Sequence, residues 1–160
     1  MNREFDIVVF GATGYTGQFV VEEVARTLQN ENSKFNWAIA GRNKDKLNEV
    51  LKTASKQVDQ KLDGIGLIDA DVSNEESLLA MCKRTRLVMN CVGPYRLYGP
   101  PVIKACIEAG THHVDVSGEP FYLETVQLLH NKEAEDKGIY IIGSCGWDSI
   151  PCDLGINFIK

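Results

Sequence analysis

The sequence predicts an α/β protein with a doubly wound parallel sheet of six or more strands and helices on both faces. Short apolar segments alternate with longer amphipathic ones along the chain, which is the pattern of parallel strands joined by crossover helices. A glycine-rich turn, residues 11–17, follows the first apolar segment and precedes the first amphipathic one. The length of 160 residues suits one domain of ordinary size. We therefore expect residues 1–160 to form a single domain of this class.

The first half of the chain contains three predicted strands, at residues 7–10, 36–40 and 66–69. The first is wholly apolar, as expected for a central strand that is buried on both faces. Apolar residues recur at helical spacing after Gly17 and again over residues 47–58. Ser73 and Glu76 have the spacing of a capping box, so a third helix is expected to start with Ser73 as its cap.

The second half contains three more predicted strands, at residues 87–92, 113–116 and 139–142. A helix is expected over residues 100–109, because it would open on two prolines and end before a glycine. Another is expected over residues 120–137. Residues 153–160 resemble the first turns of a further helix that has no partner left to pack on. We therefore expect an N-terminal domain that is truncated before a second, C-terminal domain.

Charge and hydropathy exclude several classes of function. Seventeen basic and 22 acidic residues give a net charge of −5, and the basic residues form no stripe, so nucleic acid is not an expected partner. Residues 1–6 are polar and charged rather than basic and then apolar, and no later segment stays apolar long enough to span a bilayer. We expect a cytoplasmic location.

The sequence lacks the patterns of several other sites. Five cysteines, an odd number, include no Cys-x-x-Cys pair, so we expect reduced cysteines and no metal site, with the roles of Cys145 and Cys152 open. No Tyr-x-x-x-Lys pair occurs, which excludes the proton-donor arrangement of short-chain dehydrogenases. We interpret His112, His113 and His130 as structural.

The glycine turn has the sequence Gly11-Ala-Thr-Gly14-Tyr-Thr-Gly17. Gly11 allows a tight turn, Gly14 allows the backbone to approach a phosphate, and Gly17 allows the helix to pack close to the strand. A helix N-terminus offers free N–H groups and a partial positive charge to such a phosphate. The turn therefore predicts a Rossmann fold that binds the pyrophosphate of a dinucleotide.

The end of the second predicted strand indicates which dinucleotide is bound. An Asp or Glu at this place would accept hydrogen bonds from the ribose hydroxyls of NAD. Here the residues are Ala40-Gly41-Arg42, and Asn43 or Lys46 could assist. Because an arginine offers several donors and a full charge to a 2′-phosphate, NADP is expected and NAD is less favoured.

Residues after the third and fourth strands have two interpretations each. Asp71 could accept a hydrogen bond from the adenine amino group, or it could cap the following helix. Gly93 would let the backbone lie beside the nicotinamide ribose. Tyr95, Arg96 and Tyr98 are expected in a loop over the cleft, where they would stack on or bind a substrate, or form an ordinary surface loop.

The ends of the fifth and sixth predicted strands, residues 115–119 and 143–153, are expected to face the same crevice. A carboxylate there could act as an acid or a base. Ser117 and Glu119 would also suit the cap of the helix that opens at Pro120, which is the interpretation that we place first. Residues 148–153 could equally be a rigid exit from the sheet. No catalytic residue is assigned.

Five motifs then occur in order: residues 10–18 (FGATGYTGQ), 40–42 (AGR), 90–95 (NCVGPY), 115–119 (DVSGE) and 146–151 (GWDSIP). Together they resemble the N-terminal NADP-binding Rossmann domain of the saccharopine dehydrogenase-like oxidoreductases, over essentially the whole chain. The resemblance implies a second domain after this one. The resemblance and the glycine turn together give nine expected cofactor-binding residues: Gly11, Thr13, Gly14, Tyr15, Thr16, Gly17, Arg42, Asp71 and Gly93.

The resemblance also implies a function. An NADP(H)-dependent oxidoreductase would pass hydride to or from a C=O, C=N or C=C group of a small-molecule or lipid-related substrate, and the second domain would supply most substrate contacts. The family is related to bacterial enoyl reductases, and its members are associated with membranes or lipid droplets through the C-terminal half. A homodimer is one expected assembly. The alternative is a non-catalytic dinucleotide-sensing or scaffolding module, because this segment shows no evident acid or base and is expected to bind cofactor without turnover.

Overall fold

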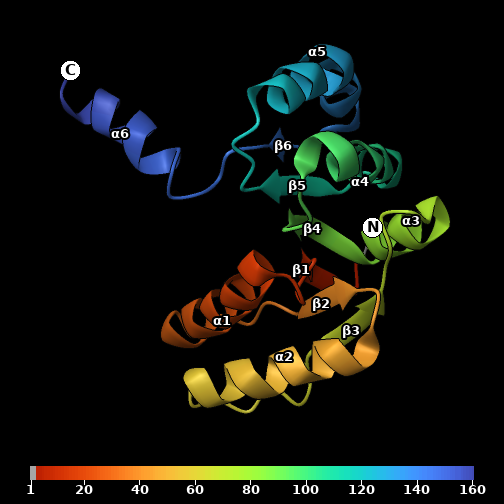
Figure 1. Ribbon diagram of the computed structural model, residues 1–160, viewed down its shortest axis with the longest axis vertical. Helices are drawn as coiled ribbons and strands as arrows, with labels where there is room; N and C mark the ends of the chain where they lie inside the picture. Colours follow the sequence, from red (N-terminus) through yellow and green to blue (C-terminus); the bar gives the residue numbers. More distant parts are fainter. Residues whose placement is uncertain (1–2) are drawn as a thin grey trace.

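A computed structural model describes residues 3–160 and contains a six-stranded sheet (Figure 1). The sheet order is β3-β2-β1-β4-β5-β6, and all neighbouring strands are parallel. The strands are β1 (Phe5–Phe10), β2 (Trp37–Gly41), β3 (Gly66–Asp69), β4 (Thr85–Asn90), β5 (His112–Asp115) and β6 (Ile141–Ile142). The predicted fold class is confirmed. Met1 and Asn2, at the start of the polar N-terminal segment, lie outside the described residues.

The helices form two layers around this sheet. Figure 1 shows α1 and α2 on one side of it and α3, α4 and α5 on the other, while α6 projects away from the body. The helices are α1 (Tyr15–Asn30), α2 (Lys44–Gln57), α3 (Glu75–Arg84), α4 (Tyr95–Ala109), α5 (Pro120–Lys137) and α6 (Ile150–Phe158). None of the helices formed by residues 3–160 combines the length and the hydropathy needed to cross a membrane.

The core lies on both faces of β1. Val8 and Phe10 pack into the cluster that includes Met81 of α3, whereas Val9 packs on the other side with Val21 of α1 and Leu47 of α2. Successive side chains of a strand point to opposite faces, so a strand buried on both faces must be apolar throughout. This explains why apolar and polar residues do not alternate along the predicted first strand.

α4 begins earlier than the sequence predicts. It starts at Tyr95, so Pro100 and Pro101 lie inside the helix rather than at its first turn. Tyr95, Arg96 and Tyr98 are therefore helical, and the predicted loop over the cleft is wrong. A contact from another part of the chain, described below, satisfies the first backbone N–H groups of this helix.

α3 begins one residue later than the capping-box pattern indicates. Its cap is Asn74, whose side-chain oxygen accepts a hydrogen bond from the Ser77 backbone N–H at 3.0 Å. Ser73 instead donates its hydroxyl to Asp71 at 2.8 Å. The predicted Ser73 cap is thus wrong, because the neighbouring asparagine is an equally good cap and Asp71 engages the serine.

Candidate dinucleotide-binding site

The glycine turn between β1 and α1 has no room for side chains at two of its positions. Gly11 has a φ of +82°, which favours glycine, and a Cβ on it would lie 2.6 Å from Val92 Cγ2. A Cβ on Gly17 would lie 2.1 Å from the Gly11 carbonyl oxygen. The turn closes through a hydrogen bond from the Gly14 N–H to that same oxygen at 3.0 Å. Both glycines are therefore required by the close approach of α1 to the end of β1.

The N-terminus of α1 has no side-chain cap. Its N-cap residue is Gly14, and the first turn contains no acidic residue. By contrast, Asn43 caps α2 and Asn74 caps α3. The first N–H groups of α1 thus keep their hydrogen-bonding capacity and their partial positive charge, which are the properties that attract a phosphate.

A cleft of about 380 Å³ opens at the carboxyl ends of the strands beside this turn. Six of the nine predicted cofactor residues line it: Gly11, Thr13, Gly14, Arg42, Asp71 and Gly93. The other three do not. Tyr15 and Thr16 are exposed in the first turn of α1, and Gly17 is buried against the turn. The structure therefore brings together residues from four separate strand ends in one cleft.

The cleft also contains residues outside the nine predicted cofactor residues. Ala70 and Cys91 follow β3 and β4, and Tyr98 reaches the cleft from the first turn of α4. Ala70 and Cys91 could have been found from the rule that ligands bind at the carboxyl ends of parallel strands. Burial raises the pKa of the Cys91 thiol to about 11, with a smaller contribution from Asp115, so this thiol is protonated at neutral pH.

Arg42 directly follows β2 and is exposed at the cleft. It forms no salt bridge with any residue in the described part of the chain. The Asn43 side-chain oxygen accepts from the Lys46 N–H at 3.0 Å and so caps α2. An arginine without an internal carboxylate partner retains its donors for an anionic ligand.

Asp71 lines the same cleft and follows the end of β3. Its Oδ1 accepts hydrogen bonds from the Ser73 N–H at 2.9 Å and the Ser73 hydroxyl at 2.8 Å. These two bonds, with a smaller effect of the Arg42 charge, hold the pKa of Asp71 below its usual value. Asp71 is not the cap of α3, so the capping interpretation of this residue is wrong.

The wall of the cleft after β4 is held by Glu119. Glu119 occupies the N-cap position of α5, but its side chain makes no cap there. Its two oxygens accept hydrogen bonds from the Tyr95 and Arg96 N–H groups of α4, at 2.7 and 2.9 Å. The prediction that Ser117 and Glu119 cap the helix at Pro120 is therefore wrong for both side chains, because Ser117 Oγ is buried without a partner.

Asp115 joins the ends of β5, β6 and α5. Its Oδ1 accepts from the Ser117 and Ser144 N–H groups at 3.0 and 3.3 Å, and its Oδ2 accepts from the Tyr122 hydroxyl at 3.0 Å. Burial, reinforced by the Asp115 charge, raises the pKa of Tyr122 well above its usual value. The ends of β5 and β6 meet as predicted, but this carboxylate is occupied by hydrogen bonds within the protein.

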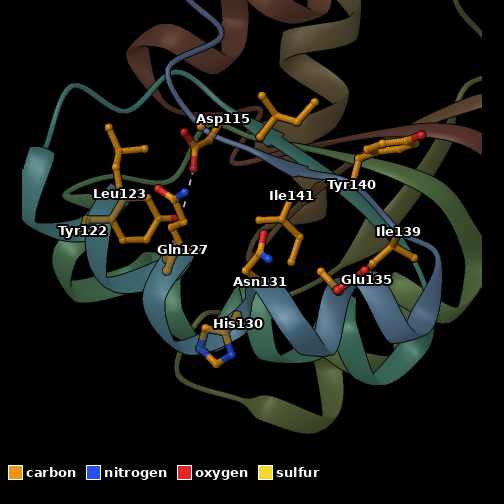
Figure 2. Close-up of a pocket in the computed structure, with 14 residues that line it drawn as sticks. Asp115, Tyr122, Leu123, Gln127, His130, Asn131, Glu135, Ile139, Tyr140 and Ile141 are labelled. Carbon is orange, nitrogen blue, oxygen red and sulfur yellow. Dashed lines mark hydrogen bonds between the residues drawn. The ribbon is translucent and has the colours of Figure 1, made fainter.

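A second, larger cleft of about 600 Å³ lies between α5 and β6. Figure 2 shows Asp115 and Tyr122 joined at one end of it, Tyr140 at the other, and Ile139 and Ile141 on its apolar wall. None of the predicted cofactor residues lines this cleft.

One histidine and two of the cysteines lie in the core. His113 is buried in β5, and burial lowers its pKa to about 4. All five cysteines are free, and Cys82 and Cys106 lie in the core with their sulfur atoms 3.6 Å apart. Within residues 3–160, no group of three or more His, Cys, Asp or Glu side chains could hold a metal ion.

Comparisons with known proteins agree with the geometry. The sequence profile of the saccharopine dehydrogenase NADP binding domain matches residues 7–142. A saccharopine dehydrogenase-like oxidoreductase of Rattus norvegicus is 50% identical over 99% of this chain, and a lipid droplet localized protein of Caenorhabditis elegans is 46% identical over 98%. The chain spans 38% and 36% of these two relatives.

The fold also matches a solved structure. Saccharopine dehydrogenase (L-Glu forming) of Saccharomyces cerevisiae has a TM-score of 0.67 and 19% sequence identity, over 90% of this chain and 28% of the other. NADP is the dinucleotide of the matching family, which confirms the cofactor predicted from Arg42. The chain belongs to the saccharopine dehydrogenase NADP-binding domain family.

Proposed function

We propose that the chain is the NADP(H)-binding part of an oxidoreductase that transfers hydride to or from a C=O, C=N or C=C group. The observation that carries this proposal is the uncapped N-terminus of α1, which opens on the same cleft as Arg42. A phosphate at α1 and a 2′-phosphate at Arg42 would together select NADP over other nucleotides.

The cleft suggests a place for each part of the dinucleotide. The pyrophosphate would lie on the backbone of Gly11 and Gly14 and on the first N–H groups of α1, at Tyr15 and Thr16, with the Thr13 hydroxyl beside it. The 2′-phosphate would lie against Arg42, and the adenine against Asp71. Gly17 would act indirectly by keeping α1 close to the turn. Gly93 would lie beside the nicotinamide ribose.

The nicotinamide ring supplies the hydride chemistry when the cofactor is bound. This chain would bind and orient the ring, and the part of the relatives beyond the matching region would supply most contacts to a small-molecule or lipid-related substrate. In this proposal residues 1–160 are an N-terminal domain. The name of the worm relative supports a lipid-droplet location for the whole protein.

One observation favours a second candidate, a dinucleotide-sensing or scaffolding module. The two carboxylates near the ends of β4 and β5, Asp115 and Glu119, both accept hydrogen bonds from protein N–H groups. Neither is a free acid or base. Substrate-dependent NADPH oxidation by the longer native protein, across enoyl, carbonyl and imine candidates, separates the two functions, since a sensor would oxidise none of them.

Titration of the chain with NADPH and NADH, by calorimetry, tests the binding proposal. We expect NADPH to bind more tightly, and Arg42→Ala to weaken NADPH about tenfold or more while leaving NADH unchanged, because a charged hydrogen bond to the 2′-phosphate is lost. Arg96→Ala is the matched control, since Arg96 is exposed but does not line the cleft. Equal affinities, or an unchanged preference in Arg42→Ala, would contradict the proposal.

A further inference from the structure

Glu119 binds the start of a helix to which it does not belong. Its side chain lies across the N-terminus of α4, 23 to 24 residues away in sequence, and each carboxylate oxygen accepts one backbone N–H. A carboxylate in this position satisfies two N–H groups that have no partner within the helix. It also places a negative charge at the positive end of the helix dipole.

The first turn of α4 depends on this contact more than an ordinary helix start does. Its N-cap residue is Pro94, which makes no side-chain cap. Pro100 and Pro101 lie inside α4 and have no N–H, so the helical hydrogen bonds that would reach the carbonyls of Arg96 and Leu97 are missing. Few bonds inside the helix therefore hold this turn, and Glu119 supplies two from outside.

The turn that Glu119 holds is part of the cofactor cleft. Gly93, two residues before α4, and Tyr98, in its first turn, both line the cleft. Tyr95 is buried beneath them and donates its hydroxyl to the Asn90 carbonyl at the end of β4, at 3.0 Å. A shift of this helix start would move the cleft wall on the β4 side.

The other wall is independent of Glu119. Arg42 and Asp71 follow β2 and β3, on the opposite half of the sheet. A dinucleotide lies across such a sheet with one nucleoside on each half. The adenosine half would therefore lie over the ends of β1–β3, and the nicotinamide half would lie on the β4 side.

We propose that Glu119 is a positioning residue for the nicotinamide half of NADP(H), acting through the first turn of α4. The inference rests on the proposed function, because it requires the dinucleotide to occupy this cleft. It assigns Glu119 no contact with the cofactor and no part in proton transfer.

The test compares two ligands on the Glu119→Gln variant. Adenosine 2′,5′-diphosphate carries the 2′-phosphate and one 5′-phosphate but no nicotinamide, whereas NADPH carries both halves. The glutamine keeps the size of the side chain but loses its charge and one acceptor. We expect NADPH to bind about fivefold more weakly and the adenosine ligand to change less than about twofold.

Two further variants sharpen the comparison. Glu124→Gln removes an exposed carboxylate one turn further along α5 that makes no salt bridge within the described residues, and it should change neither affinity. Adding Pro100→Ala and Pro101→Ala to Glu119→Gln restores two backbone donors to α4, and it should recover part of the lost NADPH affinity.

The outcomes that overturn the inference are distinct from failure of the proposed function. Equal weakening of both ligands, no weakening of NADPH, or an unfolded Glu119→Gln chain would each overturn it, because Glu119 would then support the whole fold or nothing. If the unmodified chain binds neither ligand, the proposed function itself is wrong.

Discussion

At the scale of single residues, the site depends on positions where no side chain fits. Replacing Gly17 by alanine would place a Cβ 2.1 Å from the backbone oxygen of Gly11, and backbone cannot move aside as a flexible side chain can. We expect Gly17→Ala to lower the free energy of unfolding by about 1 to 3 kcal/mol and to abolish NADPH binding, as measured by urea unfolding and calorimetry.

Gly64→Ala is the control for this substitution. Gly64 is exposed, and a Cβ on it would meet no atom within 4 Å. The Gly64→Ala substitution should change the free energy of unfolding by less than about 0.5 kcal/mol and leave NADPH binding unchanged. A Gly17→Ala variant that binds NADPH normally would show that the turn tolerates a side chain.

His113 makes stability depend on pH. Its pKa is about 4 in the folded chain because of burial, partly offset by Asp115, and about 6.5 in the unfolded chain. The unfolded state therefore takes up a proton first as the pH falls, so stability is lost between pH 6.5 and pH 4, by up to about 3 kcal/mol. We expect His113→Leu to reduce this pH dependence of the free energy of unfolding, measured by urea unfolding at several pH values between about 4 and 7, and an unchanged pH dependence would contradict the prediction.

At the scale of elements, helix starts decide the local geometry. The α3 cap is Asn74, whose side chain accepts from the Ser77 N–H at 3.0 Å. Asn74→Ala should therefore lower the free energy of unfolding by about 1 kcal/mol, and Ser73→Ala should cost less, because the Ser73 hydroxyl bonds Asp71 instead. Urea unfolding of the two variants measures this difference. A larger loss for Ser73→Ala than for Asn74→Ala would contradict the account and favour Ser73 as the cap of α3.

The helix starts also show which local features cannot be predicted from the sequence. The glycine turn and Arg42 could be predicted, because their chemistry depends on residues adjacent in sequence. The start of α4 could not, because Glu119 lies 24 residues from Tyr95 and the two prolines suggested a later start. Asn74 and Ser73 are both good caps, and only the contact between Ser73 and Asp71 decides between them.

At the scale of the whole molecule, the strand order determines where the cofactor can lie. The chain passes from β3 at one edge back to β4 beside β1, and the sheet has its crevice at this reversal. The alternating pattern predicts the six parallel strands. It does not predict the second cleft between α5 and β6 (Figure 2), because that depends on how the two elements pack.

The most direct test of the account is a crystal structure of the chain with NADP⁺. We expect the pyrophosphate on the N–H groups at the start of α1, the 2′-phosphate within hydrogen-bonding distance of Arg42, and the nicotinamide ribose beside Gly93. NADP⁺ bound elsewhere, for example between α5 and β6, or bound in this cleft with its 2′-phosphate away from Arg42, would contradict it.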